Sequence, residues 1–242
     1  MSSSAVWLIA AVASPTALAT TTLKYFNARG VVENTRVMFA IGDIEYDDRR
    51  YAIGPGFEAP EFKAEKESGA LALNLNRAPL LITGEGIIGQ SKAIERYVAK
   101  RAGLMGKSPF EAATIDMLAE HVRDVRDAQA RKGFSPMARD KTDEEKTVLA
   151  DEWYSTDLPD WLGRIEACII ELSGQDASHA CGGCLSYADV CIWSLLREGA
   201  AADVERIAKA SAACTTLNCI ADTVSTHPKV AAWVASRPET AF

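Results

Sequence analysis

Two cysteines and one histidine lie close together in the second half of the chain. Cys181 and Cys184 are separated by two glycines, and His179 precedes them. Thiol and imidazole groups at this spacing can bind zinc or undergo redox chemistry. A structural zinc ion needs four ligands, and the sequence offers no convincing fourth one nearby, so we do not expect a bound metal. A local disulfide is the alternative if the chain is exported to an oxidising compartment.

A second pair of residues, Gln90 and Ser91, could bind an anion. They stand at the start of a helical pattern over residues 91–101, in which Ile94, Tyr97 and Val98 share one face. The first N–H groups of a helix have no partner within it, and the helix dipole favours negative charge there. Ser91 could also be a plain N-cap, which does not exclude binding.

Tyr25 is a third candidate for chemistry. It lies in TLKYF at 22–26, a short run rich in β-forming residues, and turn-forming residues follow at 27–30. The pattern predicts a strand that ends just after Tyr25. Aromatic residues are common in strands as packing groups. The pattern alone therefore favours a core aromatic over a chemical role for Tyr25.

The elements that would hold these side chains fall into two halves. The first half is predicted to contain a strand at 22–26, a helix at 32–41, a polar edge strand at 45–51, a hairpin within 78–88 and a helix at 91–101. A loop with two glycines and two prolines lies at 54–60. The order is strand, helix, three strands and helix.

Beyond a turn-rich linker at 103–109, every pattern is helical. Apolar residues recur at helical spacing over 115–125 and 158–172. Ser186 and Asp189 form a capping box before a run that is apolar nearly all round, which predicts a buried helix. Patterning alone thus indicates a two-domain protein, with an α/β half followed by an all-helical half.

The composition excludes some classes of function. The chain has 242 residues, 48% of them apolar and 24% charged, as in an ordinary globular protein. The formal net charge is −7, and the sequence contains no basic tract. Nucleic-acid binding depends on Lys and Arg contacts to phosphate, so a nucleic acid is not the expected partner.

The first twenty residues differ from the rest. Residues 1–20 carry no charged side chain, and their apolar run at 5–12 is too short to span a bilayer. Ala17 to Ala19 would suit a signal-peptide cleavage site, although no Lys or Arg stands near the start. A cleaved targeting segment would place the protein in the secretory pathway or an organelle. A loosely packed extension would leave it cytoplasmic, and in both cases the segment is excluded from the fold.

The residues around Tyr25 carry a family resemblance. The segment LKYFNARG at 23–30 resembles the opening strand and turn of tyrosine-type glutathione S-transferases, the sigma class most closely. The resemblance continues in order through NRAP at 76–79, QSKAIERY at 90–97, SYAD at 186–189, HPKV at 227–230, and Trp233 to Pro238. It implies a thioredoxin-like α/β domain at 21–103 and an all-helical domain at 109–242. It also implies glutathione as co-substrate without a cofactor, an apolar electrophile as second substrate, and a homodimer.

The resemblance gives roles to several residues. Only the thiolate of glutathione is a good nucleophile, and a free thiol has a pKa of ~8.5. The Tyr25 hydroxyl would donate to the sulfur and lower that pKa. Pro79 would be a cis-proline that turns the backbone of Ala78 toward the cysteinyl unit, as in strand addition. Gln90 and Ser91 would hold the γ-glutamyl carboxylate.

Four further residues belong to the implied glutathione site. Arg77 lies in the matched turn before Pro79, and Phe62 and Lys66 are the candidates for contacting the glycine carboxylate. In the sigma class, an Asp at the position of Asp124 reaches across the dimer to the glutathione amino group. Asp124 lies off the apolar stripe of its helix, so a solvated surface charge is the alternative.

Val31 departs from the family pattern. Sigma-class relatives commonly carry an Arg at this position, two residues after the one matched by Arg29. Thiolate stabilisation would then depend more on Tyr25 and the local backbone.

The implied activity is conjugation of glutathione to electrophiles in detoxification, with the acceptor site lined by Met105 and residues 117–128. The alternatives are a glutathione-dependent isomerase or peroxidase acting on lipids, or a non-catalytic binding protein.

Overall fold

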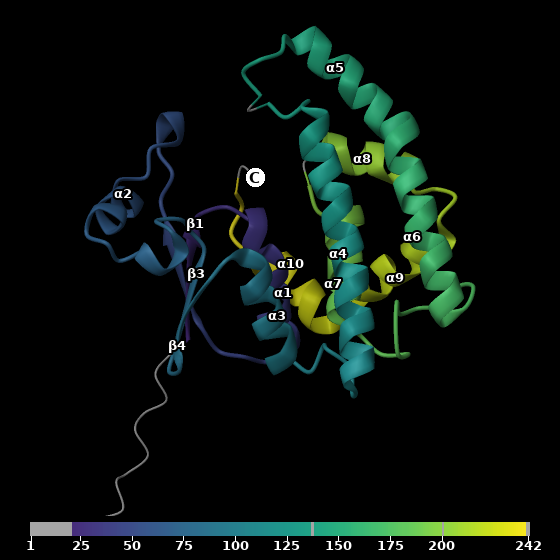
Figure 1. The fold of residues 1–242 in the computed structure, drawn as a ribbon, viewed down its shortest axis with the longest axis horizontal. Helices are drawn as coiled ribbons and strands as arrows, with labels where there is room; N and C mark the ends of the chain where they lie inside the picture. Colours follow the sequence, from purple (N-terminus) through teal and green to yellow (C-terminus); the bar gives the residue numbers. More distant parts are fainter. Residues whose placement is uncertain (1–20, 137, 200, 241–242) are drawn as a thin grey trace, which may run out of the picture.

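The computed structural model describes residues 21–136, 138–199 and 201–240. The predicted targeting segment at 1–20 lies outside these residues. The described chain forms an α/β half and a larger helical half that lie side by side (Figure 1). Among the described helices, none is both long enough and apolar enough to cross a membrane.

The α/β half is built on one four-stranded sheet with the order β2-β1-β3-β4. Its strands are β1 (Thr22–Phe26), β2 (Asp47–Tyr51), β3 (Leu80–Thr83) and β4 (Gly86–Gly89). β1 pairs parallel to β2, whereas β1–β3 and β3–β4 are antiparallel. The predicted strand at 22–26, the edge strand and the hairpin are therefore confirmed.

Two helices of the α/β half were predicted and one was missed. A 3₁₀ turn (Gly30–Val32) leads into α1 (Glu33–Ile41), and α3 (Ser91–Arg101) has the predicted bounds. α2 (Pro60–Glu67) was not predicted. Its only large apolar residue is Phe62, so the segment shows no helical periodicity.

The second half is helical, as predicted. Its helices are α4 (Pro109–Lys132), α5 (Asp143–Glu152), α6 (Leu158–Ser173), α7 (Tyr187–Arg197), α8 (Ala201–Ala210), α9 (Thr215–Thr226) and α10 (Pro228–Ser236). α7 packs against α4, α8, α9 and α1, and it is buried from Tyr187 to Leu196. Ser186 and Asp189 form the predicted capping box at its start.

A chain of charges joins the two halves. α10 returns to the α/β half and packs beside α1 (Figure 1). The Glu33 carboxylate on α1 accepts hydrogen bonds from Trp233 Nε1 and Arg237 Nη1, both at 2.8 Å. Arg237 also pairs with Glu198 at 2.9 Å, and Glu198 pairs with Arg29 at 3.3 Å. These contacts fix the turn after β1 to the end of α7 and to the segment after α10.

Candidate functional site

The sheet register brings three of the predicted site residues together. One residue beyond the last pair of the β1–β3 ladder lie Tyr25 and Pro79. One residue beyond the last pair of the β3–β4 ladder lie Pro79 and Gln90. They therefore form a row across one end of the sheet. They are separated by 54 residues (79 − 25) and 11 residues (90 − 79) in the chain, so only the strand pairing makes them neighbours.

The Tyr25 side chain is held against the turn that follows β1. Its ring is half-buried and meets the Phe26 ring edge-on, with 5.4 Å between centroids. A Cβ atom placed on Gly30 would lie only 2.7 Å from the Tyr25 hydroxyl oxygen. Gly30 also has a φ of +45°, which favours glycine. In the described part of the chain the hydroxyl has no hydrogen-bond partner, so its proton can be donated to a ligand.

The turn before β3 has the predicted cis bond, between Ala78 and Pro79. Pro79 is buried, Ala78 is half-buried and Arg77 is exposed. Because Ala78 lies just beyond the row, its backbone is at the same end of the sheet as Tyr25. Arg77 is on the same turn, with its side chain in solvent.

Asn74 connects this turn to the start of α3, and no pattern in the sequence predicts this role. Its side chain donates to the carbonyl oxygens of Arg77 and Pro79, at 3.0 and 2.8 Å. Its Oδ1 accepts from the Gln90 N–H at 3.1 Å. A Cβ atom on Gly89 would lie 2.6 Å from the Asn74 amide, so that glycine makes room for it. One buried amide therefore fixes two parts of the predicted site relative to each other.

Gln90 and Ser91 lie at the N-terminus of α3, as predicted. Gln90 has a φ of 67°, an uncommon conformation for a residue with a side chain, and such a backbone costs about 1–3 kcal/mol. Its side chain makes no capping hydrogen bond to α3. The first N–H groups of α3 can therefore bind an anion, which the helix dipole would stabilise.

Phe62 and Lys66 both lie on α2, but in different surroundings. The Phe62 ring packs on Phe26 and Tyr51, with centroid distances of 4.9 and 5.5 Å, which anchors α2 on the sheet. Lys66 is exposed in the last turn of α2. The structure thus gives Phe62 a packing contact and leaves the Lys66 ammonium in solvent.

Glu65 fixes α2 to the strands. Its carboxylate accepts from Lys24 Nζ at 2.7 Å and from the Tyr51 hydroxyl at 2.8 Å. Burial opposes the charged form of Glu65, but the hydrogen bonds from Lys24 and Tyr51 lower its pKa overall. Burial and the same hydrogen bond raise the pKa of Tyr51. Glu65 is therefore a carboxylate that holds the helix carrying Lys66.

Asp124 and Arg29 lie outside the row at the end of the sheet. Asp124 is exposed on α4, in the helical half. Arg29 is paired with Glu198 and so belongs to the charge chain between the halves. Val31 is 50% exposed and brings no charge to the turn.

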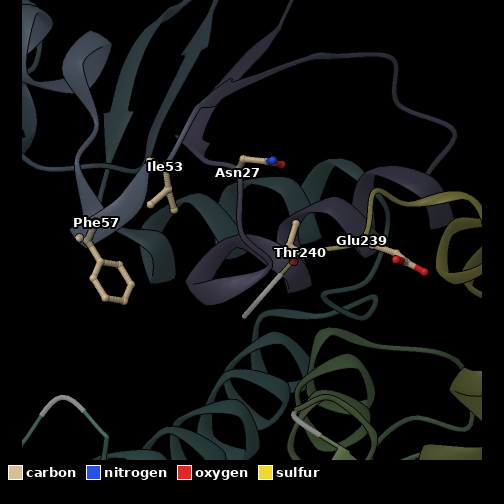
Figure 2. A pocket seen from close by; sticks show the side chains of 7 residues that line it. Asn27, Ile53, Phe57, Glu239 and Thr240 are labelled. Atoms are coloured by element: carbon tan, nitrogen blue, oxygen red, sulfur yellow. The ribbon is translucent and has the colours of Figure 1, made fainter.

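A pocket of about 370 Å³ lies beside the turn after β1. Figure 2 shows that its lining comes from this turn, from the loop after β2 and from the segment after α10. The lining residues are Asn27, Ile53, Gly54, Gly56, Phe57, Glu239 and Thr240. None of them was predicted, and none lies within the expected lining at Met105 and 117–128. Only the folded chain brings these three segments together.

In the described part of the chain, no group of three or more His, Cys, Asp and Glu side chains is arranged to hold a metal ion. His179, Cys181 and Cys184 therefore do not form such a group. All six cysteines are free thiols.

The sheet and the helical half together define a two-domain fold with a thioredoxin-like first domain. Residues 21–100 match the family described as glutathione S-transferase, N-terminal domain. Residues 128–237 match its C-terminal domain. A glutathione S-transferase of Plasmodium falciparum (isolate 3D7) is 30% identical over 178 residues, which are 72% of this chain and 77% of that protein. The chain belongs to the glutathione S-transferase family.

Other relatives match over a shorter length. Glutathione S-transferase 2 of Gallus gallus is 35% identical over 117 residues, 48% of this chain. Glutathione S-transferase Mu 1 of Bos taurus is 34% identical over 117 residues, 47% of this chain. The chain spans about half the length of these two relatives, 52% of each.

Solved structures share the fold over nearly the whole chain. The Pi-class glutathione S-transferase of Onchocerca volvulus has a TM-score of 0.72 and 25% identity, covering 90% of this chain and 93% of that one. A glutathione S-transferase of Necator americanus, described as monomeric, has a TM-score of 0.73 and 23% identity, covering 92% and 100%. The second likeness shows the fold alone.

Proposed function

We propose that this protein binds glutathione and transfers its thiolate to electrophilic substrates. The observation that carries the proposal is the row of Tyr25, Pro79 and Gln90 at one end of the sheet. It combines a hydroxyl donor, a turned backbone and the N-terminus of a helix. These three features complement the thiol, the peptide and the γ-glutamyl carboxylate of glutathione.

The row and the residues beside it would each bind one part of glutathione. The Tyr25 hydroxyl donates a hydrogen bond to the sulfur, which favours the thiolate over the thiol. The Ala78 backbone pairs with the cysteinyl unit, and Arg77 flanks it. Gln90 and Ser91 hold the γ-glutamyl carboxylate at the start of α3. The thiolate then attacks the electrophile, so that a sulfur–carbon bond forms as the leaving group departs with its electron pair.

Three further residues complete the proposed glutathione site. Lys66 and Phe62 on α2 are proposed to lie toward the glycine end, with Lys66 supplying the charge and Phe62 fixing the helix. We also propose a homodimer in which Asp124 of one subunit reaches the glutathione amino group of the other. Sedimentation or light scattering tests this, since a monomer would remove Asp124 from the site.

The electrophile is proposed to bind in the pocket beside Asn27. Ile53 and Phe57 supply apolar surface there, and Phe57 is 56% exposed. The pocket lining includes Asn27, two residues after Tyr25 in the chain, which supports an acceptor site near the proposed position of the sulfur. The expected lining at Met105 and residues 117–128 stays a prediction beside it.

The enzyme class and the domain boundaries also belong to the proposal. Tyr25 and the Phe26 that follows it favour a tyrosine-type enzyme of the sigma class. Several relatives carry Mu names, so the comparisons do not single out the sigma class. We propose domain limits of 21–103 and 109–242, with residues 1–20 as a targeting segment.

The function is tested with glutathione resin and a generic aryl halide acceptor. We expect retention on the resin and formation of the thioether. In Ser91→Ala, KM for glutathione should rise about tenfold with kcat nearly unchanged, because a hydrogen bond to a charged group contributes about 1.5–3 kcal/mol. Ser236→Ala, an exposed serine on α10, is the control and should match the parent protein. Absence of both retention and conjugation would refute the proposal.

Gly30→Ala tests how closely the turn positions Tyr25. The new methyl group would press on the Tyr25 hydroxyl, and φ would stay in a region that alanine disfavours. Because small misplacements of a reacting group lower rates steeply, we expect kcat to fall about tenfold. Gly163→Ala on α6, where a Cβ meets nothing within 4 Å, should leave kcat unchanged. Equal rates in the two variants would show that Gly30 does not position Tyr25.

A further inference from the structure

The Cys181 and Cys184 pair has no role in the proposed reaction. Between the two cysteines, Gly182 and Gly183 form a turn with φ values of 70° and 67°. Two left-handed residues at the centre of a turn are typical of a tight chain reversal of type I′. The first and last Cα atoms of such a turn lie within about 7 Å. A disulfide needs Cα atoms about 4.4–6.8 Å apart, so this backbone brings the cysteines within reach of one.

The turn is fixed on both sides. The Ala180 N–H, just before Cys181, donates to Asp189 Oδ1 at 2.7 Å, which connects the turn to the capping box of α7. On the other side, a Cβ atom on Gly182 would clash with the Glu111 carboxylate, so the turn touches the first turn of α4. Glu111 also accepts from the Lys107 N–H at 2.7 Å. The cysteines are therefore presented by an anchored turn.

The two thiols are not equivalent. Cys184 is exposed, whereas Cys181 is half-buried. Burial raises the pKa of Cys181, and the negative charges of Glu111 and Asp189 raise it further. A thiolate is the attacking species in thiol–disulfide exchange. Cys184 is thus the thiol that meets an oxidant first, and Cys181 is the one that closes the bond.

We propose that Cys181 and Cys184 form a reversible disulfide by exchange with a small-molecule disulfide such as glutathione disulfide. The Cys184 thiolate attacks one sulfur of glutathione disulfide, forms a mixed disulfide and releases one glutathione thiolate. The Cys181 thiolate then attacks the Cys184 sulfur, forms the internal bond and releases the second glutathione. The two cysteines lose two electrons and two protons, and glutathione disulfide becomes two molecules of glutathione.

The remaining cysteines offer no equivalent pair in the described structure. Cys191 and Cys214 are buried, and burial raises the pKa of both thiols. Cys168 is half-buried on α6 and Cys219 half-buried on α9. Neither Cys168 nor Cys219 faces another cysteine across a two-residue turn, as Cys181 and Cys184 do. The proposal stands on the turn and its anchoring, independently of the transferase reaction.

The test is a redox titration of the full chain. The protein is equilibrated in mixtures of reduced and oxidised glutathione, quenched with acid, treated with a maleimide under denaturing conditions and weighed intact. We expect two thiols to become protected together, with the mass lowered by two hydrogens before alkylation and no glutathionyl adduct. Dithiothreitol should restore both thiols.

Matched variants distinguish the roles of the two cysteines. Cys181→Ser should stop at a single glutathionyl adduct on Cys184, because the closing thiol is missing. Cys184→Ser should lose the paired protection and gain no adduct at Cys181. Cys168→Ser should behave as the parent chain does. Full alkylation of all six cysteines in oxidised glutathione, or a parent chain that stops at a stable mixed disulfide, would overturn the proposal.

Discussion

Replacing Tyr25 with Phe should lower kcat/KM for glutathione conjugation by about 10²–10³-fold. This is the usual loss when one hydrogen-bond donor that stabilises a negative charge is removed. The structure offers little to replace it. Val31 carries no charge, and Arg29 is paired with Glu198. The ring itself should stay in place, because its edge-on contact with the Phe26 ring does not involve the hydroxyl proton.

The pKa of bound glutathione gives a second measurement for this variant. If Tyr25 has the proposed role, the thiolate should form in the parent protein with a pKa below the ~8.5 of a free thiol. In Tyr25→Phe the pKa should return toward that value. An ultraviolet titration of the thiolate, together with the pH dependence of kcat/KM, records the change. The rate should therefore rise with pH through a higher pH range in the variant than in the parent protein.

Tyr46→Phe is the matched control. Tyr46 stacks on Phe39 with a centroid distance of 4.1 Å, and its buried hydroxyl oxygen has no hydrogen-bond partner among the residues that the structure describes. Tyr46→Phe removes the same hydroxyl group as Tyr25→Phe, but from a tyrosine that is not part of the row at the end of the sheet. We expect parent-like kinetics. If Tyr25→Phe also shows parent-like kinetics and an unchanged thiolate titration, the proposed role of Tyr25 is wrong.

Glu33→Gln should lower the free energy of unfolding by about 1.5–3 kcal/mol, the usual contribution of hydrogen bonds to a charged group, because Arg36 keeps Asp48 and Arg237 keeps Glu198 as second partners. Glu33 is 4% exposed, and its carboxylate meets Arg36, Trp233 and Arg237. Glutamine keeps the shape but not the charge. The fully buried Arg36 and the Arg237 guanidinium would then lose their shared counter-charge. Urea unfolding followed by tryptophan fluorescence measures the change in midpoint.

A surface ion pair between the same two halves serves as the control. Lys229 on α10 pairs with Asp43, and both side chains are largely exposed, so the pair should contribute at most about 1 kcal/mol. Lys229→Ala should therefore leave the unfolding midpoint nearly unchanged. Equal losses in Glu33→Gln and Lys229→Ala would show that burial of the charge chain does not matter. A parent-like midpoint in Glu33→Gln would show that the chain adds no stability.

Much of the fold could be predicted because its signals are local. The helix at 91–101 and the buried helix after Ser186 each carry apolar periodicity or a capping box that a single sequence displays. The row of Tyr25, Pro79 and Gln90 could be named from the family resemblance. Its geometry depends on strand pairing, which no local pattern specifies.

The missed features depend on long-range contacts. Asn74 looks no different from Asn76 in the sequence, yet only Asn74 is buried between the turn and α3. The contact of Glu33 with Arg237 joins residues 204 positions apart. α2 was missed because its stability depends on Glu65 and Phe62 meeting the sheet, rather than on an apolar stripe of its own.

The pocket beside Asn27 has a consequence for how this protein could diversify. None of its lining residues belongs to the buried core, since all are half-buried or exposed. Substitutions at such positions usually change stability by less than about 0.5 kcal/mol. Ile53, Phe57 and Thr240 can therefore vary during evolution with little risk to folding, while Asn74 and Gly30 cannot. Natural selection could thus alter the lining of this pocket rapidly while the end of the sheet that carries Tyr25, Pro79 and Gln90 stays constant.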